Sequence, residues 1–259
     1  MTADVPLTTV ARAFEILEHI REEGGASVSE LTDALELPKS TVHDYVTTLT
    51  RLGYLTNDGG EYDLSLAFLT HGTYARDGVA YADRVEPALE RLADETGEIV
   101  WYIVEERGRG VYAGRGLGRD ALQPYASIGT RSALHTIAGG KAILAALPDD
   151  RVDEIVAEHG LERHTERTIT TRGELEDARE RIAERGYALN DGENIDGWRA
   201  VASPVVLEEE DLYGAIAVAG PENRLSGEYF TETLPDLAAG TANEVQLRLR
   251  SEVGTKFSG

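Results

Sequence analysis

The stretch from Ser27 to Leu64 limits the possible folds of this chain more than any other segment does. Ser27 and Glu30 have the spacing of a capping box, in which a hydroxyl and a carboxylate satisfy free N–H groups at the start of a helix. Pro38 interrupts the apolar pattern that follows and suits the first turn of a second helix. Gly53 stands where a left-handed residue can end that helix. The pattern predicts two helices joined by a tight turn.

A hairpin signal follows the second helix, because residues 57–60 (NDGG) form a favoured turn between short strand-like segments. Any small helical domain can contain two such helices, but two helices followed by a hairpin predict a winged helix-turn-helix. The second helix would then enter a DNA major groove, and Val42, Val46, Leu49 and Leu52 would form its inward stripe. Its other side carries the candidate DNA-binding residues Lys39, Ser40, Thr41, His43, Asp44, Thr47, Thr48 and Arg51.

A further helix is expected before this motif, capped by Thr8 or Thr9. It would supply the third helix that a winged domain needs to cover its core. Apolar residues recur there at helical spacing. The stripe consists of Val10, Phe14, Leu17 and Ile20.

The composition excludes several classes of protein. With 259 residues and 41% hydrophobic residues, the chain is predicted to form one or two globular domains. It has no cysteine, which excludes disulfides, thiol catalysis and cysteine-based metal sites. No apolar run approaches the ~20 residues that span a bilayer, and residues 1–10 lack the pattern of a signal peptide. We therefore expect a cytoplasmic protein that has no membrane partner.

The charge balance is strongly acidic, with 47 acidic and 25 basic residues and a formal net charge of -22. The lysines are only Lys39, Lys141 and Lys256. This balance favours a halophilic protein kept soluble by its net charge, although an acidic mesophilic protein would look similar. Acidity argues against DNA binding, but the second helix carries only Lys39, Asp44 and Arg51 as formal charges. In concentrated salt, moreover, counterion release contributes little to binding.

The remainder of the chain mixes strands and helices. Residues 99–113 resemble a hairpin, and three successive strands are expected between residues 187 and 218. Sequential strands with segregated helices predict an α+β fold with a mainly antiparallel sheet. The expected organisation is a winged helix-turn-helix DNA-binding domain at 1–66, a connecting helix at 67–82 and a second domain at 83–259.

Short motifs occur in order along nearly the whole chain. In the first domain they are residues 10–17 (VARAFEIL), 37–42 (LPKSTV) and 52–55 (LGYL). In the second domain they are residues 134–142 (LHTIAGGKA), 165–170 (TERTIT), 185–188 (RGYA), 202–205 (ASPV) and 217–221 (AVAGP). No single motif is specific, but by their shared order and spacing these segments together resemble the IclR family of transcription regulators.

The resemblance implies a winged helix-turn-helix, a connecting helix and a GAF-like effector domain with an antiparallel sheet and flanking helices. The implied partners are a double-stranded DNA operator, a small-molecule metabolite effector and further copies of the chain in a homodimer or homotetramer. It implies no cofactor, catalytic residue or metal. The effector-binding residues that it implies are Ser127, Ala138, Gly139, Asn190, Asp191, Glu193, Trp198, Ala200, Ala217 and Ala219.

The sequence departs from the family pattern at both expected sites. Asp44 stands where members often have an arginine, which removes a phosphate or guanine contact and favours accepting a hydrogen bond from cytosine N4. In the pocket, members that bind small acids present serines and an aspartate, whereas this chain has Ala217, Ala219 and Asn190. We therefore expect an effector that is larger or less polar than a two- or three-carbon acid, with Trp198 or Trp101 against it.

The sequence gives little support for a metal site, an acid–base site or a phosphate-binding loop. Residues 159–164 (HGLERH) lack the four-residue helical spacing of metal ligands and are interpreted as surface polar residues. Asp191, Glu193 and Asp196 form an acidic cluster, interpreted as an exposed loop at the pocket mouth rather than a cation or acid–base site. Residues 114–119 (GRGLGR) lack phosphate-loop spacing and are expected to form the exit loop of a hairpin.

Two functions remain open at this stage. The first is a sequence-specific, DNA-binding transcription regulator of metabolic genes, controlled by an effector in the second domain. The second is a metabolite-binding or catalytic GAF-like protein in which the helix-turn-helix serves assembly only. We favour the first, which is not an enzyme. The double variant Ser40→Ala with Thr41→Ala distinguishes the two functions. Only the first function predicts that this variant loses specific duplex binding while its ligand affinity is unchanged.

Overall fold

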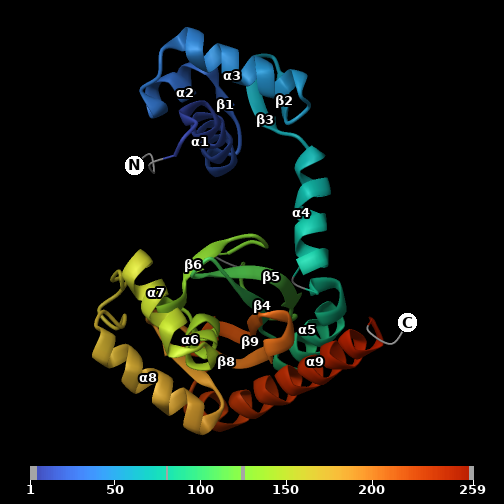
Figure 1. The fold of residues 1–259 in the computed structure, drawn as a ribbon, viewed down its shortest axis with the longest axis vertical. Coiled ribbons are helices and arrows are strands. Elements are labelled where there is room, and N and C mark those ends of the chain that lie inside the picture. The colour runs from blue at the N-terminus through green and yellow to red at the C-terminus, as the bar shows by residue number, and fades with distance from the viewer. Residues whose placement is uncertain (1–4, 80, 124–125, 257–259) are drawn as a thin grey trace. The chain divides into compact units, whose positions relative to one another are not determined.

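The computed structural model describes residues 5–79, 81–123 and 126–256. The chain forms two compact units, Met1–Ala75 and Arg76–Gly259, here called the N-terminal and C-terminal units. The division falls within helix α4 (Ala67–Val79), inside the expected connecting helix (Figure 1). The domain boundaries at 66 and 82 stay a prediction. Among the described residues, no helix combines the length and apolarity required to cross a membrane.

The N-terminal unit has the predicted helix–turn–helix–hairpin order. Its elements before α4 are α1 (Thr8–Glu23), β1 (Ala26–Ser27), α2 (Val28–Leu35), α3 (Lys39–Arg51), β2 (Leu55–Asp58) and β3 (Glu61–Leu64). The strands form an antiparallel sheet in the order β1-β3-β2. The capping box is confirmed, because the Glu30 amide donates to Ser27 Oγ at 3.3 Å and the Ser27 amide donates to Glu30 Oε2 at 2.8 Å.

The predicted apolar stripe on α1 is only partly correct. Leu17 and Ile20 are buried, but Val10 and Phe14 are 51% and 58% exposed. The core instead takes Ile16, because α1 turns that face toward the inner sides of α2 and α3. Two further expectations are wrong. Leu52 is 66% exposed, since α3 ends before it, and α1 has Leu7 at its N-cap without a side-chain bond.

The C-terminal unit has the predicted α+β architecture. Its six-stranded sheet has the order β6-β5-β4-β9-β8-β7, and every neighbouring pair is antiparallel. The strands are β4 (Ile99–Glu106), β5 (Arg109–Leu117), β6 (Arg131–Ala133), β7 (Ala188–Asp191), β8 (Trp198–Leu207) and β9 (Leu212–Pro221). The helices are α5 (Ala82–Thr96), α6 (Ala138–Ala146), α7 (Asp149–His159), α8 (Arg172–Arg185) and α9 (Leu234–Lys256), with short helical turns η1 (Leu134–Thr136), η2 (Glu208–Glu210) and η3 (Tyr229–Thr233).

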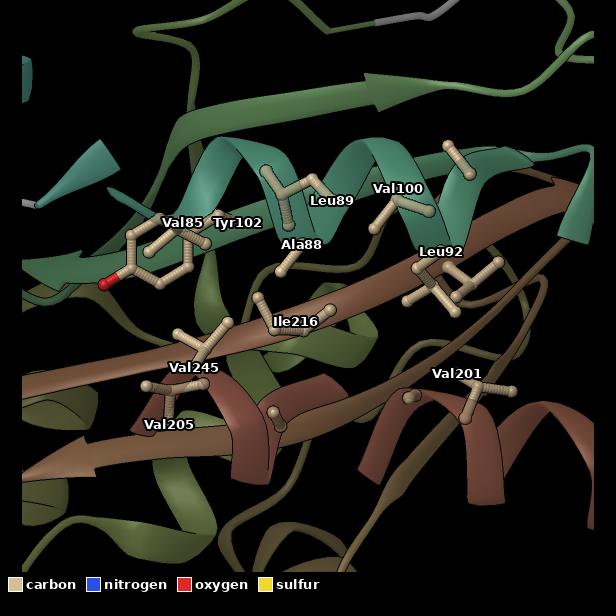
Figure 2. Packing of buried hydrophobic residues seen from close by; sticks show 14 of the residues in the cluster. Val85, Ala88, Leu89, Leu92, Val100, Tyr102, Val201, Val205, Ile216 and Val245 are labelled. Atoms are coloured by element: carbon tan, nitrogen blue, oxygen red, sulfur yellow. The ribbon is translucent and has the colours of Figure 1, made fainter. Parts of the chain in front are cut away.

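The sheet separates two apolar cores. On one face α5 and α9 pack against alternate strand residues, and Figure 2 shows Leu89 on α5 and Val245 on α9 near Ile216 of β9. On the other face α6, α7 and α8 cover the intervening residues, which include Trp101 and Ile103 of β4. Because successive side chains of a strand point to opposite faces, one strand contributes to both cores.

Glycines in β5 allow α5 to lie unusually close to the sheet. Residues 114–119 were expected to form an exit loop, but β5 continues as a strand to Leu117. A Cβ atom at Gly116 would overlap the backbone carbonyl of Leu89, and one at Gly118 would overlap the backbone of Gly97. The expectation was wrong because the alternate glycines mark close backbone approach rather than a flexible loop.

We expect Gly116→Ala to destabilise the C-terminal unit by about 1–3 kcal/mol, because the helix or the strand must shift to admit a methyl group. Gly240→Ala in α9 is the matched control, since its Cβ would have no other atom within 4 Å. That control should be neutral or stabilising by up to about 1 kcal/mol. The measurement is denaturant unfolding in molar potassium chloride. Equal stability of Gly116→Ala and the wild type would contradict the close approach.

Candidate DNA interface and ligand cavity

The candidate DNA-binding residues share one helix face. Helix α3 buries Val42, Val46 and Leu49 against the core of the N-terminal unit. None of the eight predicted contact residues is buried. They occupy the remaining surface of α3, from its first turn to its last. They are Lys39, Ser40, Thr41, His43, Asp44, Thr47, Thr48 and Arg51.

Local hydrogen bonds decide what α3 presents. Its first turn has no side-chain cap, because Pro38 occupies the N-cap position. The backbone N–H groups of that turn are thus available to a phosphate. Thr48 Oγ1 donates to the Asp44 carbonyl oxygen at 2.7 Å. Thr48 therefore presents a methyl group and oxygen lone pairs outward, while the carboxylate of Asp44 is exposed as a hydrogen-bond acceptor.

The N-terminal unit has a higher ratio of acidic to basic residues than the whole chain. Residues 1–75 hold twelve carboxylate side chains and four basic ones, and the hairpin at 55–64 has three carboxylates and no lysine or arginine. Arg12 pairs with Glu15 at 2.6 Å. Arg21 pairs with Glu18 at 2.8 Å. This leaves Lys39 and Arg51 of α3 as the basic groups best placed for a phosphate, so phosphate attraction is weak.

A small cavity lies inside the C-terminal unit, on the side of the sheet that packs against α6. Residues of β4, β5, β8 and β9 line it, together with residues 137–139 at the start of α6 and residues of the segment 190–195. About 30 Å³ is open to the centres of water-sized molecules. Seven of the ten predicted effector-binding residues line it. They are Ala138, Gly139, Asn190, Trp198, Ala200, Ala217 and Ala219.

The start of α6 gives the cavity a positive end. Ile137 is the N-cap and makes no side-chain hydrogen bond, so the first-turn N–H groups have no side-chain acceptor. These groups and the helix dipole favour an anion. Gly139 allows the start of α6 to lie close to β4, because a Cβ atom at this position would lie only 2.6 Å from Ile103 Cδ1.

Asp191 and Glu193 do not line the cavity, because each is held by a basic partner. Asp191 accepts a hydrogen bond from Arg199, which lowers the pKa of its carboxyl group. Glu193 forms a buried ion pair with Lys141, whose side chain is 6% exposed. Burial lowers the pKa of Lys141 and the Glu193 carboxylate opposes that shift. The described residues contain no group of three or more His, Asp or Glu side chains placed to hold a metal ion.

Ser127 is also absent from the cavity lining. It is exposed in a turn, where its backbone amide donates to Thr130 Oγ1 at 3.0 Å. Asn190 does line the cavity but is occupied by the framework. Its amide nitrogen donates to the Thr136 carbonyl at 2.7 Å, and its amide oxygen accepts from the Glu193 N–H at 3.1 Å. An aspartate cannot make the first of these bonds, which accounts for the asparagine.

Trp101 of β4 is the most informative residue of the lining, although the family resemblance does not indicate it. Its side chain is 1% exposed, and its Nε1 has no hydrogen-bond partner among the described residues. Leaving a buried N–H group unpaired costs about 1–3 kcal/mol. Period-two alternation along β4 predicts its face correctly. The sequence itself names Trp101 as a candidate wall for the effector. The lining residues that sequence reasoning did not select are Ile103, Tyr112, Ile137, Asn194 and Ile195.

The lining agrees with one half of the expectation about the effector. Methyl and aromatic groups dominate, as the low polarity of Ala217 and Ala219 predicts. The size of the effector stays a prediction.

His135 fixes the chain as it enters α6. It is 4% exposed, and its Nε2 lies 2.9 Å from the carbonyl oxygen of Glu162. Because a carbonyl only accepts, Nε2 carries the proton in this bond. Burial lowers the pKa of His135, and the bond to Glu162 acts in the opposite direction. The two histidines of residues 159–164 are separately engaged, His159 by the Arg107 carbonyl and His164 by Asn194, which agrees with their interpretation as surface polar residues.

Two family models match the chain. The model of the bacterial transcriptional regulator IclR C-terminal domain matches residues 77–247, and that of the IclR helix-turn-helix domain matches residues 9–59. The chain belongs to the IclR family. It is a helix-turn-helix transcription regulator with a C-terminal effector-binding domain, and not an enzyme. The comparisons support this function over the alternative in which the helix-turn-helix serves assembly only.

Relatives extend over nearly the whole chain. A protein named as the HTH-type transcriptional regulator ArcR of Halobacterium salinarum is 33% identical over 252 residues, 95% of each chain. The crystal structure of Thermotoga maritima IclR is 26% identical, with a TM-score of 0.78 over 93% of this chain and 98% of that one. An IclR homologue from Microbacterium hydrocarbonoxydans, complexed with 4-hydroxybenzoate, is 21% identical with a TM-score of 0.77, over 94% and 99% of the two chains. Halobacterium is a halophilic archaeon, which agrees with the halophilic character expected here.

We expect an unusually shallow salt dependence of operator binding. Each phosphate contact contributes about -0.9 to the slope of log K against log salt concentration, so Lys39 and Arg51 predict about -2 per recognition helix. Asp58→Lys on the hairpin should steepen the slope by about 1 if the hairpin lies against the DNA backbone. Asp150→Lys on α7 is the control and should leave it unchanged. Anisotropy titrations with a short duplex in graded potassium chloride measure the slope, and a wild-type slope of -5 per helix would refute this account.

The stability of the C-terminal unit should fall as the pH falls below about 6.5, the ordinary pKa of histidine. The pKa of folded His135 is lowered, so the unfolded chain binds the proton more tightly. The contribution is complete above the unfolded pKa and is lost as the pH falls toward the folded one. Unfolding free energies at about pH 7.5 and 5.5 measure it. In His135→Gln, which keeps a donor for Glu162 but does not titrate there, the decrease should be smaller; an equal decrease would assign it to other groups.

Proposed function

We propose that this protein is a cytoplasmic homodimer that regulates metabolic genes by binding an operator with two α3 helices, under control of a compact organic acid. Each α3 occupies the major groove of one half-site. The effector occupies the cavity of the C-terminal unit. The observation that carries this proposal is the exposed polar face of α3 in a chain whose other unit encloses a cavity beside an uncapped helix start.

The chemistry along α3 supports a division of roles. Lys39 and Arg51 stand at its two ends, where they suit phosphates on either side of the groove. Asp44 lies between them, and a carboxylate accepts well from cytosine N4. The methyl group of Thr48 suits the C5-methyl group of thymine. The polar but nearly uncharged surface favours specificity through base edges over affinity through phosphates.

The homodimer is supported by apolar surface on α1. Leu7 is 67% exposed, Val10 51% and Phe14 58%. These positions are three and four residues apart, so they lie along one side of the helix. Exposed apolar patches on soluble proteins commonly mark contacts with a partner, and a two-fold axis pairs a patch with its own copy. Two copies also supply the two recognition helices that a palindromic operator requires.

The compact acid is supported by the two ends of the cavity. The α6 start attracts a carboxylate, while Ala200, Ala217 and Ala219 provide an apolar wall for the rest of the molecule. The nearby acidic side chains are already neutralised by Arg199 and Lys141. Effector binding can shift the operator affinity only by binding one conformation of the protein better than another.

The decisive experiment measures anisotropy of the duplex immediately upstream of the gene, against a scrambled duplex of equal length, in molar potassium chloride. We expect a preference for the native duplex of at least about 100-fold, as specific binders usually show. The double variant Ser40→Ala with Thr41→Ala should lose most of this preference. Thr233→Ala, an exposed threonine outside the N-terminal unit, is the control and should keep it.

The proposal fails if no duplex is preferred and recovery of bound fragments from total genomic DNA also yields no enriched site. It fails equally if the double variant binds like the wild type, because α3 would then not be the recognition helix. A complex with one copy of the chain per operator would contradict the homodimer. Sedimentation of the complex gives that ratio.

A further inference from the structure

Trp101 lines the effector cavity and carries a buried hydrogen-bond donor. It lies on the central strand β4, opposite Ala217 of β9 on one side and Arg115 of β5 on the other. Its side chain lines the cavity, and its indole N–H has no partner among the described residues. Folded proteins satisfy nearly all buried donors, so each exception indicates a functional or structural reason.

The indole is packed among neighbouring side chains. The ring of Tyr112 meets it at 75° with the centroids 4.8 Å apart. The guanidinium carbon of Arg115 lies 6.0 Å from the indole centroid. With 1% of the side chain exposed, no bulk solvent reaches it. A donor held in this way is preorganised for an acceptor on a ligand, because the side chain loses little conformational entropy when the ligand binds.

The cavity thus offers donors from two directions. The start of α6 supplies backbone N–H groups, which suit a carboxylate. On the sheet side Ala200, Ala217 and Ala219 contribute only methyl groups, and the indole N–H of Trp101 is a donor that has no partner among the described residues. A ligand that satisfies both must carry a carboxylate and a second oxygen acceptor on a short, otherwise apolar skeleton.

We infer that Trp101 determines effector specificity by donating its indole N–H to a carbonyl or hydroxyl oxygen adjacent to the carboxylate of a compact acid. This inference rests on the proposed function, since it concerns the same cavity. Trp101 rejects acids that lack the second oxygen, because they leave the indole N–H unpaired in a closed site. It takes the place of side-chain hydroxyls on β9, where this chain has alanines.

The test compares pyruvate with propionate, which differ by a keto oxygen in place of two hydrogens. Calorimetric titration of the wild type should show pyruvate bound at least about tenfold more tightly, since a buried donor is satisfied only by pyruvate. Trp101→Phe keeps an aromatic wall without the N–H and should bind both acids with similar affinity. Leu247→Ala changes an exposed residue of α9 outside the cavity lining and should keep the preference.

The inference is wrong if Trp101→Phe keeps the wild-type preference, or if it weakens both acids equally, as a merely structural role predicts. It is also wrong if the wild type shows no preference or binds neither acid. Operator binding is measured separately, so the two proposals fail distinguishably. If operator preference is intact and Trp101→Phe has no effect on the preference for pyruvate, only this inference is wrong. If pyruvate is bound selectively but no operator is preferred, only the proposed function is wrong.

A spectroscopic readout covers the case in which Trp101→Phe does not fold. The chain has two tryptophans, so ¹⁵N-indole labelling gives two N–H signals, which Trp198→Phe assigns. In the wild type we expect the Trp101 signal to move downfield with pyruvate, as a new hydrogen bond requires, and to stay in place with propionate. Equal movement with both acids, or none with pyruvate, overturns the inference.

Discussion

The burial of strand β4 on both faces is the constraint on which the C-terminal unit depends. Its first five residues are all buried, and it pairs with β5 on one edge and β9 on the other. Val100 and Tyr102 belong to the core under α5 and α9, while Trp101 and Ile103 belong to the core under α6. Each large side chain contributes about 1.5–3 kcal/mol by leaving water. The same strand therefore holds the fold together and forms the wall of the cavity.

A protein with a net charge of -22 can still attract an anion, because the potential in a buried site is set locally. At about 1 M salt the Debye length is about 3 Å, so the acidic surface scarcely acts on the cavity. Near the cavity, Asp191 is held by Arg199 and Glu193 by Lys141. What remains is the positive end of α6. The N-terminal unit faces the opposite situation, since its surface meets a polyanion directly and has few cations to offer.

Local sequence patterns predicted the helix starts and helix bounds well, because interactions between residues close in sequence determine them. The capping box of Ser27 follows from a three-residue spacing, and α7 and α8 have charged ends and apolar periods that fix their bounds. The three-residue β6 was missed, since so short a segment carries no period. On α1, spacing indicated a stripe but could not say that the core would take Ile16 in place of Phe14.

The cavity shows the same limit. Strand alternation and the family resemblance together indicated Ala217 and Ala219, which do line it. The resemblance also indicated Glu193, but its partner Lys141 is 52 residues away, and no local rule connects them. The unpaired N–H of Trp101 is a property of everything around the ring, and therefore of the folded chain alone. Interactions between distant segments are what sequence reasoning could not reach.

The alternation along β9 also has an evolutionary consequence. Ala217 and Ala219 face the cavity, while Ile216 and Val218 face the core under α5 and α9. An alanine codon becomes a serine codon by one nucleotide change, and the added hydroxyl is small enough to enter without repacking the opposite core. Under the proposed function, descendants of this gene can therefore acquire a different effector while keeping the same operator. Selection can act on the signal and on the target as separate traits.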